Sequence, residues 1–165
     1  KMSDDRYKPI DFIPPQKSKA ADSTPVSMTK QFKEKRAYSI YSINSQDKAI
    51  QIEDGSQVEG SYVINTKTKK LPFQEFYIQQ TVNGYKLFPT HCNLAIGVNK
   101  LVPDQPVVLG PTKFDSWDIV REEGAKYSIK LNKCGLSLAV LDGNSGNENI
   151  LVVTEPKNSS YWYIE

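Results

Sequence analysis

The chain has 165 residues, of which 38% are hydrophobic and 24% charged, and its formal net charge is +2. This length and composition are typical of one globular domain with at most an appendage. The balanced charge does not indicate a nucleic-acid partner, and no apolar run approaches the roughly 20 residues of a membrane span.

Residues 1–35 are predicted to form an extended or flexible N-terminal arm, separate from a domain over 36–165. The arm is rich in proline and has no hydrophobic period, which is typical of a linker. It has no apolar run typical of a secretion signal, so the protein is expected in the cytoplasm, or secreted after removal of a signal. A flexible tail is one interpretation. In the other, Ile10, Phe12 and Ile13 pack against the domain or a partner, because these side chains are costly to leave in water.

From Tyr41 onward the sequence repeats with a period of about 42 residues. The tyrosines at 41, 85 and 127 are 44 and 42 residues apart, and each is expected to open a strand. Nine residues after each tyrosine an alternating apolar run begins, at 50–52, 94–98 and 136–140. A third short apolar run follows at 62–64, 107–109 and 150–153. Each unit closes with an aromatic residue, any residue and isoleucine, at 76–78, 117–119 and 162–164.

Three units of four short strands predict an all-β protein with the β-trefoil fold, a six-stranded barrel with three hairpins. Alternation along the closing strands places one aromatic residue and one isoleucine per unit in the core. These residues are Phe76, Trp117 and Trp162 with Ile78, Ile119 and Ile164. Their neighbours Tyr77, Asp118 and Tyr163 are predicted to face outward.

The final repeat, which opens with Gly124-Ala-Lys-Tyr-Ser-Ile and ends with Trp-Tyr-Ile-Glu, resembles the fungal β-trefoil protease inhibitors, the mycocypin-like group and related serine protease inhibitors. The resemblance covers about 36–165 and implies a monomeric inhibitor that acts through exposed loops. A weaker resemblance is to ricin-B-type lectins, which place Gln-x-Trp near each repeat end. Here only Gln74-Glu75-Phe76 comes close to that motif, and the glutamine is replaced by Asp115 and Ser160 in the other two units.

Catalysis and metal binding are not expected. The only histidine, His91, precedes Cys92, and adjacent strand residues point to opposite faces, so the pair is a poor catalytic dyad. We interpret it as a turn histidine beside a small buried thiol, and a disulfide between Cys92 and Cys134 as the less favoured alternative. One histidine and two distant cysteines cannot supply a zinc site. The run 142–149 lacks the glycine and glutamate of an EF-hand and is interpreted as a hairpin loop. No cofactor or metal is therefore predicted.

Once catalysis and metal binding are set aside, binding of a partner through exposed loops is the function that we expect. The resemblance implies a papain-like, legumain-like or trypsin-like protease as the partner of an inhibitory loop. Lys69 or Lys70, before Leu71-Pro72, could enter a trypsin-like pocket, and Asn93 could enter a legumain-like one. We therefore predict a protease inhibitor first, a ricin-B-like carbohydrate-binding module with a glycan partner second, and a protein-interaction module that uses the arm third.

Overall fold

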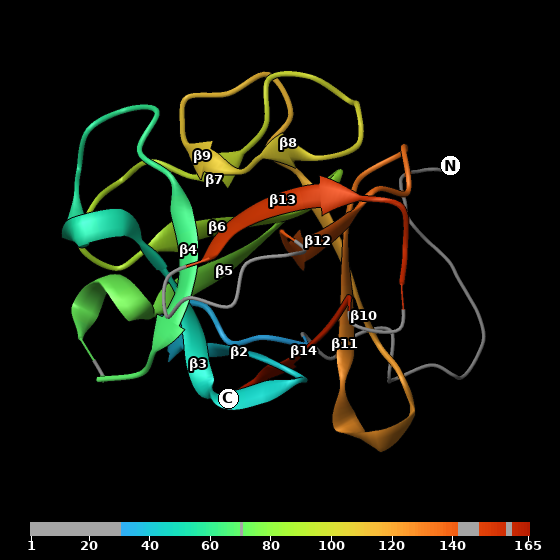
Figure 1. Cartoon of the computed structure of the whole chain (residues 1–165), viewed down its shortest axis with the longest axis horizontal. Helices are drawn as coiled ribbons and strands as arrows, with labels where there is room; N and C mark the ends of the chain where they lie inside the picture. Colours follow the sequence, from blue (N-terminus) through green and yellow to red (C-terminus); the bar gives the residue numbers. More distant parts are fainter. Residues whose placement is uncertain (1–30, 70, 142–148, 158–159) are drawn as a thin grey trace, which may run out of the picture. The chain divides into compact units, whose positions relative to one another are not determined.

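The computed structural model describes residues 31–69, 71–141, 149–157 and 160–165, and its compact unit runs from Glu34 to Glu165. Fourteen short strands dominate this unit (Figure 1). They are β1 (Ala37–Tyr38), β2 (Ile40–Ser42), β3 (Ser45–Ile52), β4 (Val63–Lys67), β5 (Phe76–Thr81), β6 (Gly84–Pro89), β7 (Ile96–Gly97), β8 (Gln105–Pro106), β9 (Val108–Leu109), β10 (Trp117–Arg121), β11 (Tyr127–Leu131), β12 (Ser137–Val140), β13 (Asn149–Thr154) and β14 (Tyr161–Ile164). Three single turns of 3-10 helix, at Glu53–Gly55, Pro72–Gln74 and Glu123–Ala125, are the helices of the described residues, and none is long enough to cross a membrane.

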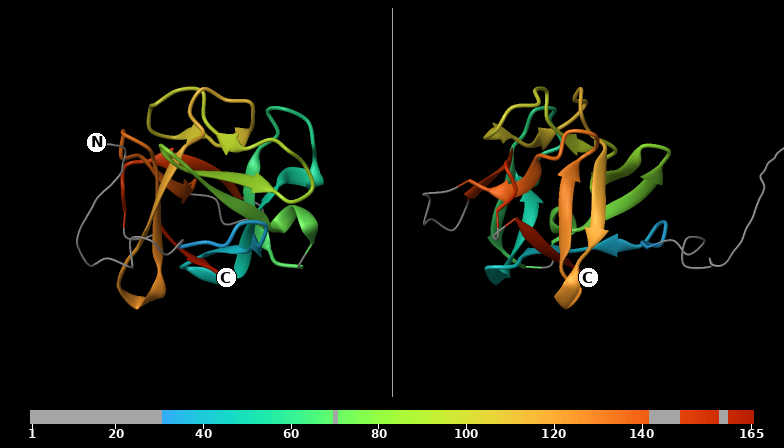
Figure 2. Two further views of the ribbon diagram at one scale, coloured as in Figure 1. Left: turned by 180° about the vertical axis from the view of Figure 1, so that it is seen from behind. Right: turned by 90° about the vertical axis from the view of Figure 1, so that its right-hand side faces the viewer.

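Six strand positions form a closed antiparallel barrel. In order around the barrel, β1 pairs with β5, β5 with β6, β6 with β10, β10 with β11, β11 with β14, and β14 with β2. The ring is complete because β1 and β2 are successive parts of one extended run, separated only by Ser39. The β10–β11 pair is visible as the long orange hairpin in the right-hand view of Figure 2.

Three further strand pairs, outside the barrel, form one hairpin in each repeat. These are β3–β4, β7–β9 and β12–β13, and β13 also pairs with β4 and β8. A six-stranded barrel with three hairpins is the predicted β-trefoil, so the fold prediction is confirmed.

The register corrects one detail of the predicted repeat. Tyr38, not Tyr41, is the equivalent of Tyr85 and Tyr127, because the three residues lie opposite Phe76, Trp117 and Trp162, respectively. Tyr41 does lie in a barrel strand, but three positions further on. The connection from the first strand to the second is longer by three residues in the first repeat, and the spacing of identical residue types concealed this insertion.

The core consists of layers with one side chain from each repeat. Phe76, Trp117 and Trp162 are fully buried, as predicted, and Ile40, Leu87 and Ile129 form an equivalent buried set. Burial of each such side chain stabilises the fold by roughly 1.5–3 kcal/mol. Of the predicted isoleucines, Ile78 and Ile119 are buried but Ile164 is only half-buried.

Both tryptophans bind the hairpin strand of their own repeat. Trp117 Nε1 donates to the Ile96 carbonyl at 3.2 Å, and Trp162 Nε1 donates to the Leu138 carbonyl at 3.1 Å. Phe76 has no such donor. In its repeat the equivalent carbonyl, that of Ile52, accepts a long 3.5 Å bond from Gln51 Nε2.

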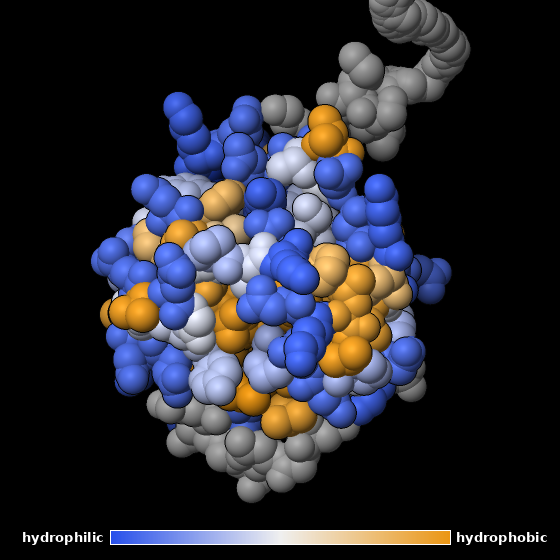
Figure 3. All heavy atoms as spheres, turned by 90° about the horizontal axis from the view of Figure 1, so that it is seen from above, coloured by the Kyte–Doolittle hydropathy of each residue, from blue (hydrophilic) through white to orange (hydrophobic). Residues whose placement is uncertain are grey.

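Exposed hydrophobic side chains do not form one large face on the side of the molecule shown in Figure 3. On that side they lie in separate patches among hydrophilic groups. The described residues with large exposed apolar side chains include Leu101, Val102 and Val120. Scattered exposed groups of this kind are ordinary on a protein surface and do not indicate a docking face.

Candidate ligand-binding groove

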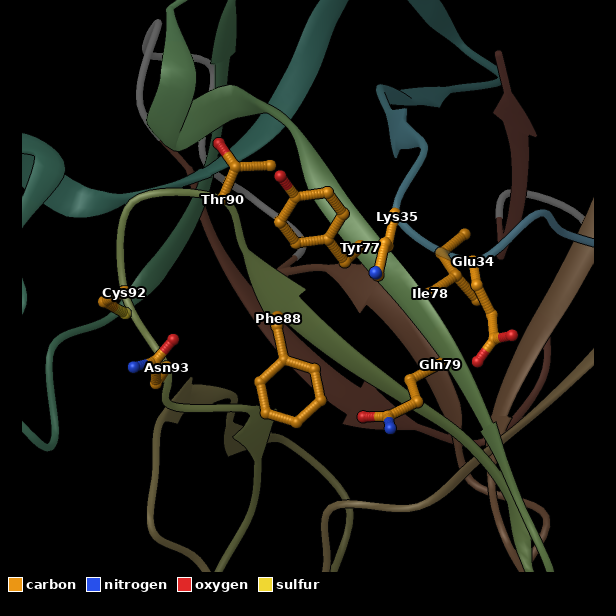
Figure 4. Close-up of a pocket in the computed structure, with 9 residues that line it drawn as sticks. All are labelled: Glu34, Lys35, Tyr77, Ile78, Gln79, Phe88, Thr90, Cys92 and Asn93. Carbon is orange, nitrogen blue, oxygen red and sulfur yellow. The ribbon is translucent and has the colours of Figure 1, made fainter.

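The hairpin of β5 and β6 holds two aromatic side chains outside the barrel. Tyr77 and Phe88 lie directly opposite one another in the register, on the outward face of a pair whose inward residues include Ile78 and Leu87. Tyr77 is 39% exposed, as its alternation predicts, and Phe88 is half-buried. Side chains opposite each other across strands have Cβ atoms roughly 4.5–5.5 Å apart. In Figure 4 the Tyr77 ring extends toward Thr90, and the Phe88 ring extends the other way along the same face.

A tight turn fixes the geometry of this hairpin. Thr81 Oγ1 donates to the Gly84 carbonyl at 3.1 Å and accepts from the Asn83 amide at 3.2 Å. Gly84 has φ of +130°, and a Cβ there would lie 2.6 Å from the Trp117 carbonyl oxygen. Only glycine fits this position, where β6 crosses close to β10.

The aromatic pair lies in an open groove of about 540 Å³, drawn in Figure 4. The other lining side chains are mostly polar and come from the segment before β1, from β5, and from the loop after β6. They are Glu34, Lys35, Ile78, Gln79, Thr90, Cys92 and Asn93. An apolar surface bordered by a few convergent polar groups is the usual character of a small-ligand site.

Several polar groups in the groove have no hydrogen-bond partner in the part of the chain that the structure describes. No hydrogen bond within it is formed by the side chains of Gln79, Asn93 or Lys35, whereas Thr90 Oγ1 donates to the Pro72 carbonyl at 2.7 Å. Two side-chain amides, which can donate and accept, and one ammonium, which can only donate, are therefore available to a ligand.

The loop that carries Thr90, Cys92 and Asn93 is held by His91. The His91 Nε2 atom lies 2.8 Å from the Ser56 carbonyl, which can only accept, so Nε2 carries a proton and donates it. The ring also meets Phe73 edge-on, with centroids 6.1 Å apart. His91 is thus a structural residue, as the sequence predicts, and its ring is not paired with the Cys92 thiol.

Both cysteines are free thiols. Cys92 is half-exposed in the groove and not buried as predicted, because the turn after β6 directs it toward solvent, and Cys134 is exposed. Among the described residues no three histidine, cysteine or acidic side chains lie close enough to hold a metal ion. The loop predicted at 142–149 lies outside the described residues except for Asn149, which begins β13, and the arm residues Ile10, Phe12 and Ile13 also lie outside them.

The Gln-x-aromatic motif serves the fold. Gln74 is 1% exposed, and its Oε1 accepts from the amides of Lys69 at 2.8 Å and Leu71 at 3.4 Å. Its Nε2 donates to Gln51 Oε1 at 2.7 Å and to the Lys67 carbonyl at 2.9 Å. With four partners inside the protein, Gln74 has no free group for a ligand.

The two positions equivalent to Gln74 have different partners. Asp115 lies 3.5 Å from Lys86 Nζ, and Ser160 is buried with its Oγ accepting from the Lys157 amide at 3.2 Å. At both positions the residue that replaces glutamine therefore has a partner within the protein.

The predicted inhibitory residues are separated in the structure. Lys69 is exposed on the loop that Gln74 anchors, and Lys70 lies outside the described residues. Asn93 instead belongs to the groove beside Phe88 (Figure 4). The sequence identified Asn93 through a protease hypothesis. It did not indicate the Tyr77–Phe88 pair, since the pairing depends on register.

No protein-family model matches the sequence, and no curated protein matches it. Solved structures do match. The designed threefold-symmetric protein ThreeFoil is 18% identical, with a TM-score of 0.71 over 78% of this chain and 96% of ThreeFoil. The Macrolepiota procera ricin B-like lectin, solved with lactose, is 14% identical, with a TM-score of 0.69 over 82% of this chain and 99% of the lectin.

A third similar structure is the C-half of the earthworm R-type lectin, solved with GalNAc. It is 16% identical, with a TM-score of 0.61 over 79% of this chain and 98% of the lectin. Identities this low show a shared fold alone, and the fold they share with this chain is the β-trefoil.

Proposed function

We propose that this protein binds a saccharide in the groove over β5 and β6, without chemical turnover. The observation that carries the proposal is the outward Tyr77–Phe88 pair bordered by unpaired amides. A pyranose presents one face of C–H groups and a rim of hydroxyls. Its apolar face can bury against one of the two rings, and its hydroxyls can pair with Gln79, Asn93 and Thr90.

The rigidity of the groove supports this proposal. Both rings stand on barrel strands, and the loop with Asn93 is fixed through His91, so little conformational entropy is lost when a ligand binds. Two similar structures were solved with lactose and with GalNAc, which supports the same ligand class here, although the fold alone does not assign it.

The test is a glycan array with the full-length chain, followed by titration of any glycan that binds. Tyr77→Ala and Phe88→Ala should each weaken binding by about tenfold or more, which corresponds to about 1.4 kcal/mol. Val120→Ala, at an exposed position of β10, is the matched control and should bind normally. Glycan binding that both aromatic variants retain would refute this site. Absence of binding to every glycan on the array would refute the proposed function.

Protease inhibition is a second candidate, which one observation favours. Gln74 binds the backbone of Lys67, Lys69 and Leu71, on both sides of Lys70, and a pre-organised loop is what an inhibitor requires. Assays with trypsin, legumain and papain separate the candidates. Loss of trypsin inhibition in the Lys69→Ala or Lys70→Ala variant would support the loop, and loss of legumain inhibition in Asn93→Ala would support Asn93.

A further inference from the structure

The threefold symmetry of the barrel creates three equivalent outward positions, each an opposed pair of residues on two neighbouring strands. On β5 and β6 the pair is Tyr77 and Phe88, and on β10 and β11 it is Asp118 and Lys130. On β14 and β2 it is Tyr163 and Tyr41. Two of the three equivalent positions are therefore aromatic, and these two lie about a third of a turn apart around the barrel.

The second aromatic pair also borders a hollow. A pocket of about 390 Å³ is lined by Tyr41, Gln46, Thr68, Tyr163 and Glu165. Like the first groove, it brings together two aromatic rings, a side-chain amide, a hydroxyl and a carboxylate. Within the described residues the side chains of Gln46, Thr68 and Glu165 form no hydrogen bond, so their polar atoms are available to a ligand.

The backbone around this pocket is fixed. Ser39 and Glu165 exchange two hydrogen bonds, of 2.9 and 3.0 Å, which continue the β2–β14 ladder to the end of the sequence. The Thr68 amide donates to the Asp47 carbonyl at 2.9 Å, which holds the end of β4 against β3. The polar groups are therefore held around the tyrosines by paired strands.

We propose that the Tyr41–Tyr163 pocket is a second saccharide site, which makes the protein bivalent; this proposal rests on the proposed function of the first groove. The ligand class is a neutral saccharide. The carboxylate of Glu165 accepts hydrogen bonds from hydroxyls and disfavours a sugar acid, while the phenol rings offer an apolar face. One short glycan cannot span both sites, because they face different directions, so two glycans are bound independently.

The third equivalent pair is a built-in control. Asp118 Oδ1 accepts from Asn132 Nδ2 at 2.9 Å, and the pair contains no aromatic ring. It lacks the apolar surface against which a sugar face could bury, so Asp118→Ala should leave saccharide binding unchanged.

The experiment is an NMR titration of the full chain with lactose and with GalNAc, in which shifts are followed residue by residue. Two separate sets of perturbed residues are expected, one around Tyr77 and Phe88 and one around Tyr41 and Tyr163. Tyr163→Ala should weaken only the second set by about tenfold. Tyr163→Leu, which keeps apolar volume, gives the same comparison if the alanine variant is unstable, and Tyr163→Phe should retain most of the affinity.

A second readout is cross-linking. Wild type should precipitate a polymer that carries many copies of the same sugar, whereas a variant with only one intact site should bind the polymer without precipitating it. Binding confined to the Tyr77 groove and unchanged in Tyr163→Ala would overturn the second site and leave the proposed function standing. Binding confined to the Tyr163 pocket would overturn the proposed function of the first groove and leave the second site standing. Binding at neither site would overturn both.

Discussion

Replacement of Gln74 by methionine is a direct test of how the first repeat is held together. Methionine has nearly the same length and remains compatible with burial, so the change removes the amide and little volume. Three of the four hydrogen bonds of Gln74 are short, at 2.7 to 2.9 Å, and its partners include the side chain of Gln51, which is itself 8% exposed.

The expected cost follows from these contacts. A hydrogen bond contributes roughly 0.5–1.5 kcal/mol net, and a buried group left without a partner costs about 1–3 kcal/mol. Water can reach the exposed loop and satisfy the amide of Lys69, whereas Gln51 is only 8% exposed and its Oε1 is less accessible to water. We therefore expect Gln74→Met to lower the free energy of unfolding by about 2–4 kcal/mol, at the upper end if Gln51 stays unpaired.

Urea unfolding with an unchanged m-value measures this cost. Gln79→Met, five residues further along on β5, is the matched control, because Gln79 is exposed and forms no hydrogen bond within the described residues, and it should change stability by less than about 0.5 kcal/mol. Limited trypsin digestion should also cut the variant faster in the loop at 67–71. A loss below about 1 kcal/mol, with unchanged cleavage, would show that the network is not what holds this loop.

Four further predictions concern other parts of the chain. Trp117→Phe and Trp162→Phe each leave a buried carbonyl without its 3.2 or 3.1 Å donor, so calorimetry should show a similar loss for both, about 1–3 kcal/mol. Gly84→Ala should lower the melting temperature more than Gly60→Ala, since both have positive φ but only Gly84 faces a carbonyl at 2.6 Å; equal shifts would contradict this. Deletion of residues 1–16 should lower the melting temperature or abolish partner binding through loss of Ile10, Phe12 and Ile13, whereas unchanged values with unprotected amides over 7–16 would make the arm a passive tail. A bound saccharide should slow the reaction of a maleimide with Cys92 but not with Cys134, and equal protection of both thiols would argue against the groove.

The fold could be predicted because core positions obey two periods at once. Alternation along a strand marks the inward residues, and the threefold repeat places them again about 42 residues later. Phe76, Trp117 and Trp162 satisfied both conditions, and all three are buried. The error over Tyr41 has the same origin, since a three-residue insertion in one turn shifts the count without changing which residues are buried.

The candidate site could be predicted only in part. Alternation predicts that Tyr77 faces outward, but its neighbour across the sheet is Phe88, 11 residues later, and that pairing depends on the length of the turn at Thr81–Gly84. The position of Asn93 beside them depends further on the contact of His91 with Ser56, 35 residues away in sequence. Contacts of this kind join loops that have no periodic pattern.

The same reasoning indicates which positions of this trefoil are free to differ between repeats. The barrel requires similar side chains only at inward positions, where Ile40, Leu87 and Ile129 must fill one layer. Outward positions are free to differ, and they do: the equivalent pairs are aromatic at two places and Asp118–Lys130 at the third. If the fold needed aromatic residues at these outward positions for stability, all three equivalent pairs would be aromatic. Because the third pair maintains the same strand pairing with charged side chains, the two aromatic pairs are not required by the barrel, and ligand binding is the reason that we infer for them.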